Sequence, residues 1–153
     1  FFDKLMLAFK HWLKPTEYKL NISEIDEGIR DFGKLKVQVG KVKHIAMSRG
    51  YRFTNDQGKS VAVSGDTDYC EGMIELGRDV DLMILECAWP DDEKTDGHLG
   101  PSLAGKLAME ANCKKLCLTH FYPPCDLENI RNTVQKNYKG ELLLARDLMQ
   151  FDL

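Results

Sequence analysis

Ser64-Gly65-Asp66-Thr67 is the stretch from which the fold can be worked out. It follows a strand-like apolar run at residues 59–63, so it places the carboxylate of Asp66 on a small-residue turn at a strand end. His44 and His120 each follow a further run of the same kind. Imidazole and carboxylate groups are ligands that zinc and manganese accept in proteins. The three side chains therefore predict a metal site built from the ends of strands.

The order of the expected elements changes after Ser64, from consecutive strands to strands that alternate with helices. Strands are expected at residues 18–25, 35–43, 51–54, 59–63, 82–85, 115–118, 141–144 and 148–153, and helices at residues 1–13 and 69–77, from Pro101 onward and after a cap at Asp126. The apolar stripe of the first helix is interpreted as a core-packing face. This order predicts one α/β (α+β) domain over residues 1–153, a mixed sheet covered by helices.

Glu86 and His98 form a second pair of candidate functional residues. In α/β proteins ligands bind beyond the carboxyl ends of strands, and both residues lie on segments that leave a strand or follow one. A carboxylate that hydrogen-bonds an imidazole orients it and raises its pKa, so that it can serve as a proton donor at neutral pH. Such a donor suits hydrolysis by a metal-activated water. A purely structural alternative stays open, in which Glu86 caps a backbone segment and His98 is a solvated loop residue.

Composition excludes several classes of protein. The net charge of −3 provides no basic field to recruit nucleic acid, and no apolar run approaches the roughly 20 residues of a membrane-spanning helix. The five cysteines have no disulfide-framework spacing and suit a cytoplasmic protein. Cys113 and Cys117 could be half of a zinc site, but no second pair matches them. A nucleotide-binding fold is disfavoured because no glycine-rich phosphate loop occurs.

From about residue 43 onward the sequence resembles the metallo-β-lactamase superfamily, and within it ribonuclease Z and related phosphodiesterases. Five segments, in the family's order, carry the resemblance: His44 to Arg52 (His-x5-Gly-Tyr-Arg), Ser64 to Asp68 (Gly-Asp-Thr), Asp81 to Trp89 (His-Glu-Ala-Thr-Phe), Gly97-His98 with Ser102 to Ala104 (Gly-His-Ser-Thr), and Leu116 to His120 (the final ligand motif).

The resemblance implies the C-terminal part of an αββα sandwich and a zinc-dependent two-metal centre, with manganese or iron as alternatives. His44 would bind one metal, His120 the other and Asp66 both. Metal-bound hydroxide would attack the substrate, while Glu86 orients His98 and His98 acts as general acid. The implied activity is that of a phosphodiesterase-like hydrolase in the cytoplasm, acting on a small-molecule or phosphodiester substrate.

The sequence departs from the family's pattern in three respects. The signature His-x-His-x-Asp-His is absent, so we expect a chain that lacks the N-terminal part of the fold and is inactive by itself. The competing interpretation is a non-catalytic remnant or binding domain. Only 22 positions separate His44 from Asp66, which leaves no room for the long tRNA-gripping arm of ribonuclease Z. Nucleic acid remains a conceivable partner, and the C-terminal tail would suit contacts in a homodimer.

The third departure weakens the likeness to ribonuclease Z itself. Leu85 and Cys87 replace the His and Ala that flank the family's glutamate, and Leu99-Gly100 replaces the hydroxyl residues after the family's histidine. Glu86 and His98 are retained.

Overall fold

The computed structural model describes residues 2–13, the last four as backbone only, and residues 17–152. Its strands form one seven-stranded sheet in which the spatial order equals the order in the sequence. They are β1 (Gly28–Asp31), β2 (Leu35–Lys41), β3 (Arg49–Asn55), β4 (Ser60–Val63), β5 (Leu82–Glu86), β6 (Lys115–Thr119) and β7 (Glu141–Leu144). Strands β1 to β4 pair antiparallel and β4 to β7 pair parallel, which confirms the predicted mixed sheet.

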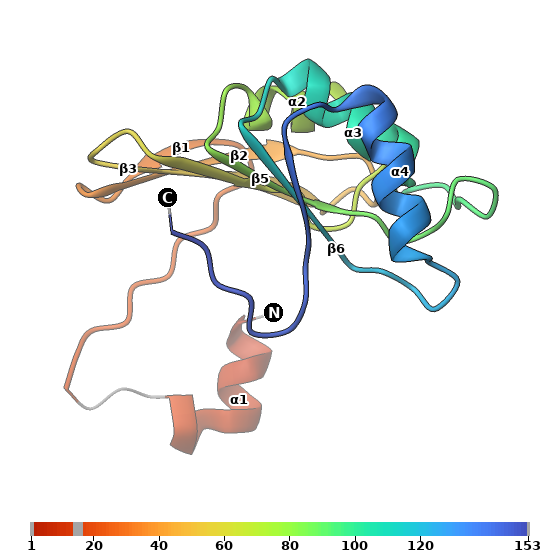
Figure 1. Ribbon diagram of the computed structural model, residues 1–153. Coiled ribbons are helices and arrows are strands. Elements are labelled where there is room, and N and C mark those ends of the chain that lie inside the picture. Colours follow the sequence, from red (N-terminus) through yellow and green to blue (C-terminus); the bar gives the residue numbers. More distant parts are fainter. Residues whose placement is uncertain (1, 14–16, 153) are drawn as a thin grey trace.

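Three helices cover one face of this sheet (Figure 1). They are α2 (Glu71–Gly77), α3 (Pro101–Ala111) and α4 (Leu127–Asn137), and each lies in a connection between parallel strands. The remaining helix, α1 (Phe2–Leu13), and the C-terminal tail lie on the other side of the sheet (Figure 1). In the part that the structure describes, no helix has the length and apolar character needed to cross a membrane.

Local sequence signals explain the element boundaries near the site. The side chain of Asp126 accepts a hydrogen bond from the backbone N–H of Glu128 (2.9 Å), so it caps α4 as predicted. Pro101 begins α3, where its missing N–H costs nothing. In the β3–β4 hairpin, Asn55 accepts two backbone hydrogen bonds, and Gly58 takes a positive φ of 80° that favours glycine.

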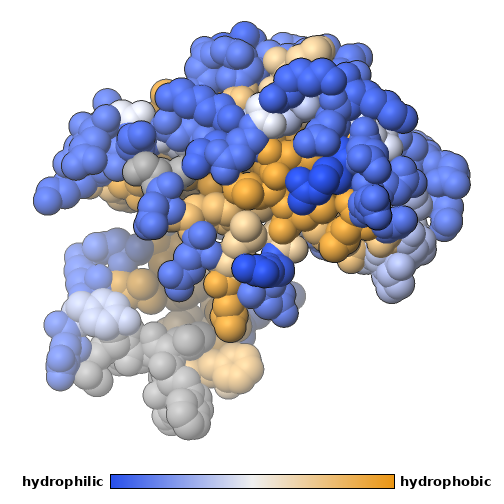
Figure 2. Space-filling view, viewed as in Figure 1, coloured by the Kyte–Doolittle hydropathy of each residue, from blue (hydrophilic) through white to orange (hydrophobic). Residues whose placement is uncertain are grey.

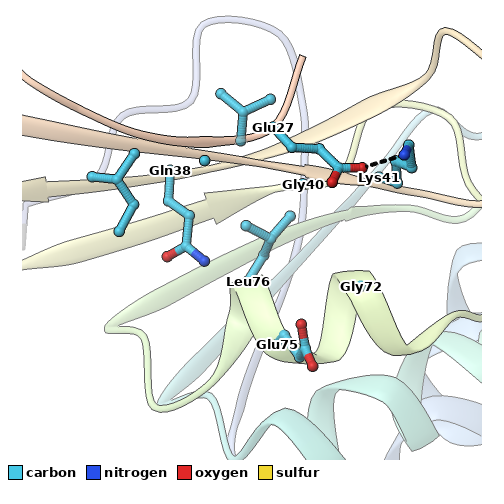
Figure 3. Close-up of a pocket in the computed structure, with 10 residues that line it drawn as sticks. Glu27, Gln38, Gly40, Lys41, Gly72, Glu75 and Leu76 are labelled. Carbon is cyan, nitrogen blue, oxygen red and sulfur yellow. Dashed lines mark ion pairs between the residues drawn. The ribbon is translucent and has the colours of Figure 1, made fainter. Parts of the chain in front are cut away.

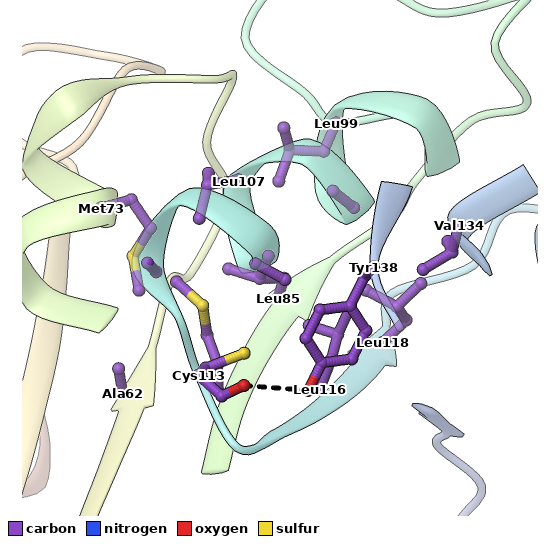
Figure 4. Close-up of a cluster of buried hydrophobic side chains, with 14 of the residues drawn as sticks. Ala62, Met73, Leu85, Leu99, Leu107, Cys113, Leu116, Leu118, Val134 and Tyr138 are labelled. Atoms are coloured by element: carbon purple, nitrogen blue, oxygen red, sulfur yellow. Dashed lines mark hydrogen bonds between the residues drawn. The ribbon is translucent and has the colours of Figure 1, made fainter. Parts of the chain in front are cut away.

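The main core lies between the sheet and its three helices (Figure 4). One register row on the helical face consists of buried apolar residues from four neighbouring strands: Ala62, Met83, Leu116 and Leu142. The Tyr138 hydroxyl donates to the Cys113 carbonyl oxygen (3.1 Å), so this phenol is satisfied inside an apolar core. Burial of this face fixes the ends of β4, β5 and β6 relative to one another.

The opposite side of the sheet, called here the second face, is also apolar. A register row across β2 to β7 consists of Val39, Tyr51, Val63, Ile84, Cys117 and Leu143. Tyr51 is 40% exposed, and none of the helices α2 to α4 lies on this side. Figure 2 shows apolar atoms in a band at the level of the sheet, between the hydrophilic helical layer and the lower segments.

Two of the predicted strands are wrong. Residues 18–25 pair with no strand, and the alternating Tyr18, Leu20 and Ile22 are exposed; the first strand is instead β1. In the tail, residues 148–152 form no strand, and residue 153 lies outside the described residues. Alternation predicts a strand only when a neighbouring strand and a core are present to pair with it.

The predicted N-terminal helix is present, but its apolar stripe is only partly a core face. Helix α1 has a non-helical backbone at Phe9, and the Phe9 side chain is half exposed. Phe2, Leu5 and Met6 are half-buried. Residue 1 and the side chain of Leu13, which the prediction included, lie outside what the structure describes.

Candidate metal centre

The five predicted site residues converge beyond the carboxyl ends of the central strands. Asp66 follows β4, Glu86 ends β5 and His120 follows β6, while His44 and His98 lie on loops beside them. Ligand atoms of His44, Asp66 and His98 all lie within 4.8 Å of one another. His120 Nε2 lies 3.6 Å from Asp66 Oδ1. The sheet therefore assembles residues that are up to 76 positions apart in the sequence.

Glu86 is a buried carboxylate that fixes the orientation of His98. Its Oε1 lies 2.8 Å from His98 Nδ1 and also accepts the Thr67 N–H, and its Oε2 accepts the N–H groups of Ala88 and Leu99. Because an ionised carboxylate only accepts hydrogen bonds, the hydrogen of the imidazole belongs on Nδ1. His98 Nε2 is then left for chemistry at the site.

The backbone holds His44 in the same way. His44 Nδ1 lies 3.1 Å from the carbonyl oxygen of Gly97, which can only accept, so Nδ1 carries the hydrogen and Nε2 keeps its lone pair. Gly97 has a φ of 85°, and a Cβ there would lie 2.8 Å from His44 Nδ1. Glycine is therefore required at position 97 both by the backbone conformation and by the approach of the imidazole.

The turns that carry Asp66 and His120 have special backbone conformations. Gly65, directly before Asp66, has a φ of 60°, in the left-handed region. His120 also has a positive φ (63°), which is uncommon for a residue with a side chain. The Asp66 and His120 side chains are 44% and 37% exposed, so they face open space rather than the core. A positive φ in a residue other than glycine, as at His120, is strained, and such strain is typical of functional sites.

A cavity of about 260 Å³ opens beside these two turns. Its walls come from β4, β5 and β6 and combine apolar strand residues with site residues: Val63, Ser64, Gly65, Asp66, Ile84, Glu86, Thr119 and His120. Val63 and Ile84 belong to the second face, so the cavity opens on that side of the sheet. It has room for a small polar group beside the Asp66 carboxylate.

A larger groove, of about 520 Å³, lies between the edge strands and α2 (Figure 3). Glu27 and Lys41 form an ion pair (2.7 Å) on its wall, and Leu76 of α2 lies against Gly40. None of the five predicted site residues lines it. Glu75 also lines it, but none of its residues belongs to the group that could hold a metal ion, so it offers no comparable chemistry.

The structure adds aromatic residues that the sequence did not single out. The ring centroids of Trp89 and Tyr122 are 4.9 Å apart, and that of Tyr122 lies 5.1 Å from His120 and 6.4 Å from His98. Tyr122 comes two residues after His120, but the chain has left its strand there, so alternation could not predict its direction. The histidines thus have an aromatic wall on one side.

Cys113 and Cys117, the alternative half of a zinc site, do not meet. Cys113 belongs to the core beneath the helices, whereas Cys117 lies on the second face. Burial raises the pKa of both thiols, which disfavours the thiolate that zinc would need.

The sequence of this chain is similar to a known protein family and to several known proteins. A family model described as "Beta-lactamase superfamily domain" matches residues 7–121. An uncharacterized protein of Mycobacterium tuberculosis is 34% identical over 110 residues, which cover 71% of this chain and 40% of that protein. Ribonuclease Z of Streptomyces coelicolor is 37% identical over 98 residues, 60% of this chain and 33% of the enzyme. The matched part of the chain therefore covers well under half the length of each of these relatives.

Solved structures share the fold. The metallo-beta-lactamase fold protein YhfI from Bacillus subtilis superimposes with a TM-score of 0.77 at 25% identity, over 94% of this chain and 60% of YhfI. Human tRNase Z, short form, gives a TM-score of 0.62 at 25% identity, over 78% of this chain and 44% of that enzyme.

Proposed function

Since this chain belongs to the metallo-β-lactamase superfamily, we propose that the protein containing it is a metal-dependent hydrolase of the phosphodiesterase type. One observation carries the proposal: ligand atoms of His44, Asp66 and His98 lie within 4.8 Å of one another, with His120 beside Asp66. The stability of the fold does not require imidazole and carboxylate side chains to cluster at solvent-exposed strand ends. The predicted ligands and the predicted general acid lie in this one cluster.

The donor set fits a divalent transition metal such as zinc. His44 offers an unprotonated Nε2, His120 a second imidazole, and Asp66 a carboxylate between the two. We assign one metal to His44, the other to His120, and Asp66 to both. Three ligands are too few for two four-coordinate ions, so further ligands are to come from elsewhere in the full-length protein. Manganese and iron accept the same donors.

When bound, such metals would lower the pKa of a water molecule and offset the negative charge of a scissile phosphodiester. His98 acts on the leaving group: its Nε2 carries a proton to the departing oxygen as the bond from phosphorus to that oxygen breaks. Glu86, hydrogen-bonded to Nδ1, keeps Nε2 directed into the site and stabilises the protonated imidazole. The short β3–β4 hairpin between His44 and Asp66 favours a small substrate over transfer RNA.

The decisive experiment measures metal content and turnover in the full-length protein. Asp66→Ala and His120→Ala should each remove most of the bound metal, measured by mass spectrometry, because each removes a ligand. His98→Ala should keep the metal and lose about 10²–10⁴-fold in turnover of bis-p-nitrophenyl phosphate. Asp56→Ala, in the exposed hairpin turn, serves as the control and should change neither quantity.

Three other results would redirect the assignment. Unchanged metal content in both ligand variants would rule out the proposed site. Loss of metal in His98→Ala would make His98 a ligand rather than the general acid. A wild-type protein that binds metal but hydrolyses no phosphodiester would favour the alternative, a non-catalytic binding domain.

A further inference from the structure

Asp68 lies two residues beyond Asp66 and has no part in the chemistry proposed above. It is 5% exposed, although it carries a carboxylate. Its backbone N–H donates to the carbonyl oxygen of Lys43 (2.6 Å), and the two residues form an isolated antiparallel bridge. Asp68 therefore fixes the residue directly before His44.

The side chain of Asp68 reaches a different segment. Its Oδ2 accepts from Lys94 Nζ (3.0 Å) and from the Gly97 N–H (3.4 Å), and its Oδ1 accepts from the Tyr69 N–H (2.8 Å). Lys94 and Gly97 belong to the loop that carries His98. The carbonyl oxygen of Gly97 in turn faces His44 Nδ1. A closed ring of contacts thus runs from Lys43 through Asp68 and Gly97 to His44.

The cations around Asp68 favour its charged form and hold it in a shielded ion pair. Burial disfavours the charged carboxylate, but the hydrogen bonds from Lys94 Nζ and the Tyr69 N–H stabilise it. Lys43 Nζ lies 3.7 Å away as a second, more exposed cation. Lys94 is itself only 19% exposed, so this ion pair is better shielded from water than an ordinary surface pair.

We propose that Asp68 is a positioning residue that holds the His98 loop against the His44 turn and thereby sets the geometry of the site. It touches neither metal nor substrate. Its effect on metal binding and turnover rests on the proposed function, whereas its effect on the loop does not. Without the negative charge, Lys94 loses its ion-pair partner and the Gly97 N–H loses a charged acceptor, so the loop is free to move away from His44.

The experiment compares Asp68→Asn with Asp81→Asn in the full-length protein. Asp81 is a matched control because it is also buried, accepts from a lysine (Lys114, 2.9 Å) and from a backbone N–H (Ser60, 2.8 Å), and lies at the opposite ends of the strands. In metal-free protein, amide exchange of residues 94–98 should become at least about tenfold faster in Asp68→Asn alone. Zinc affinity, from competition with a chelator, should fall about 10–100-fold in the same variant.

Variants of Lys94, the ion-pair partner of Asp68, provide a second test. Lys94→Met should reproduce part of the faster exchange, and the double variant with Asp68→Asn should add little, because both changes break the same contact. Lys94→Arg, which keeps the cation, should restore slow exchange. In an active protein, Asp68→Asn should lower kcat more than it raises KM.

Equal exchange of residues 94–98 in Asp68→Asn and Asp81→Asn would overturn the proposal, since Asp68 would then act only through general stability. So would faster exchange with unchanged zinc affinity, because the loop would not set the site. If the wild-type protein binds no zinc and hydrolyses nothing, the proposed function fails, and the exchange comparison alone decides whether Asp68 holds the loop.

Discussion

At Gly97 a backbone requirement and a contact with the site coincide. Its φ of 85° disfavours a side chain, and a Cβ would also lie 2.8 Å from His44 Nδ1. Gly97→Ala should therefore displace His44 and weaken zinc binding in the full-length protein by about tenfold or more. Gly58→Ala is the control: its φ is similar (80°), but a Cβ there meets no atom within 4 Å. It should cost about 1 kcal/mol of stability without changing zinc affinity, whereas equal affinity losses would contradict the prediction.

The residues of the site were more predictable than the residues that hold them. His44, Asp66, Glu86, His98 and His120 were chosen from motifs and strand ends, and all five converge. Their roles stay predictions until metal is measured. Asp68 and Gly97 could not be chosen, because their contacts join segments 29 positions apart and depend on how two loops meet.

Among the elements, the amino ends of β4, β5 and β6 are joined by Asp81. Its carboxylate accepts from Ser60 N–H and from Lys114 Nζ, and these partners hold its pKa below the usual value of 3.8. A carboxyl group with a lowered folded-state pKa contributes stability above its unfolded pKa and loses it as the pH falls through the folded one. Asp81→Asn should therefore cost about 1–2 kcal/mol at pH 7.

The difference in unfolding free energy between wild type and Asp81→Asn should shrink as the pH falls from about 5 toward 2. The wild-type carboxyl group then becomes protonated and is uncharged, as the asparagine is. Denaturant unfolding of both proteins across this range tests the prediction. A difference that stays constant with pH would show that the charge of Asp81 does not stabilise the sheet.

Elements with both a local signal and a burial face were predicted well. The β3–β4 hairpin has its Asn-Asp-Gln-Gly turn, and α4 has its Asp126 cap and the buried Ile130 and Val134. Residues 18–25 have the alternation of a strand but neither a pairing partner nor a core to cover them. Strand β1 begins with glycine and ends with aspartate, so its composition did not predict it, and its pairing with β2 defines it.

For the whole molecule, cysteine reactivity reports whether both faces of the sheet are packed. Burial raises the pKa of Cys113 to about 11 and that of Cys87 further. Cys117, on the second face, is 1% exposed, and burial raises its pKa as well. At pH 7.5 these three should resist iodoacetamide, while half-buried Cys70 reacts first.

Mass spectrometry of the native protein counts the alkylated thiols, and all five should react in denaturant. Rapid modification of Cys117 with Cys113 intact would contradict the expected packing of the second face.

The predicted fold class is confirmed at this scale: the chain forms one mixed sheet with a helical layer, one half of the superfamily's αββα arrangement. Composition alone could not predict what lies over the second face, since apolar alternation specifies a buried side but not its partner.

The sequential order of the strands also determines how the chain can fold. Every strand pairs with its neighbours in the sequence, so the sheet can lengthen one strand at a time without waiting for a distant segment. If the sheet grows in this order, the segments of His44 and Asp66 are placed before that of His120, which needs β6 to pair with β5. The proposed ligands on this chain can therefore come together only after β6 has docked on β5, so the site would be completed late in folding.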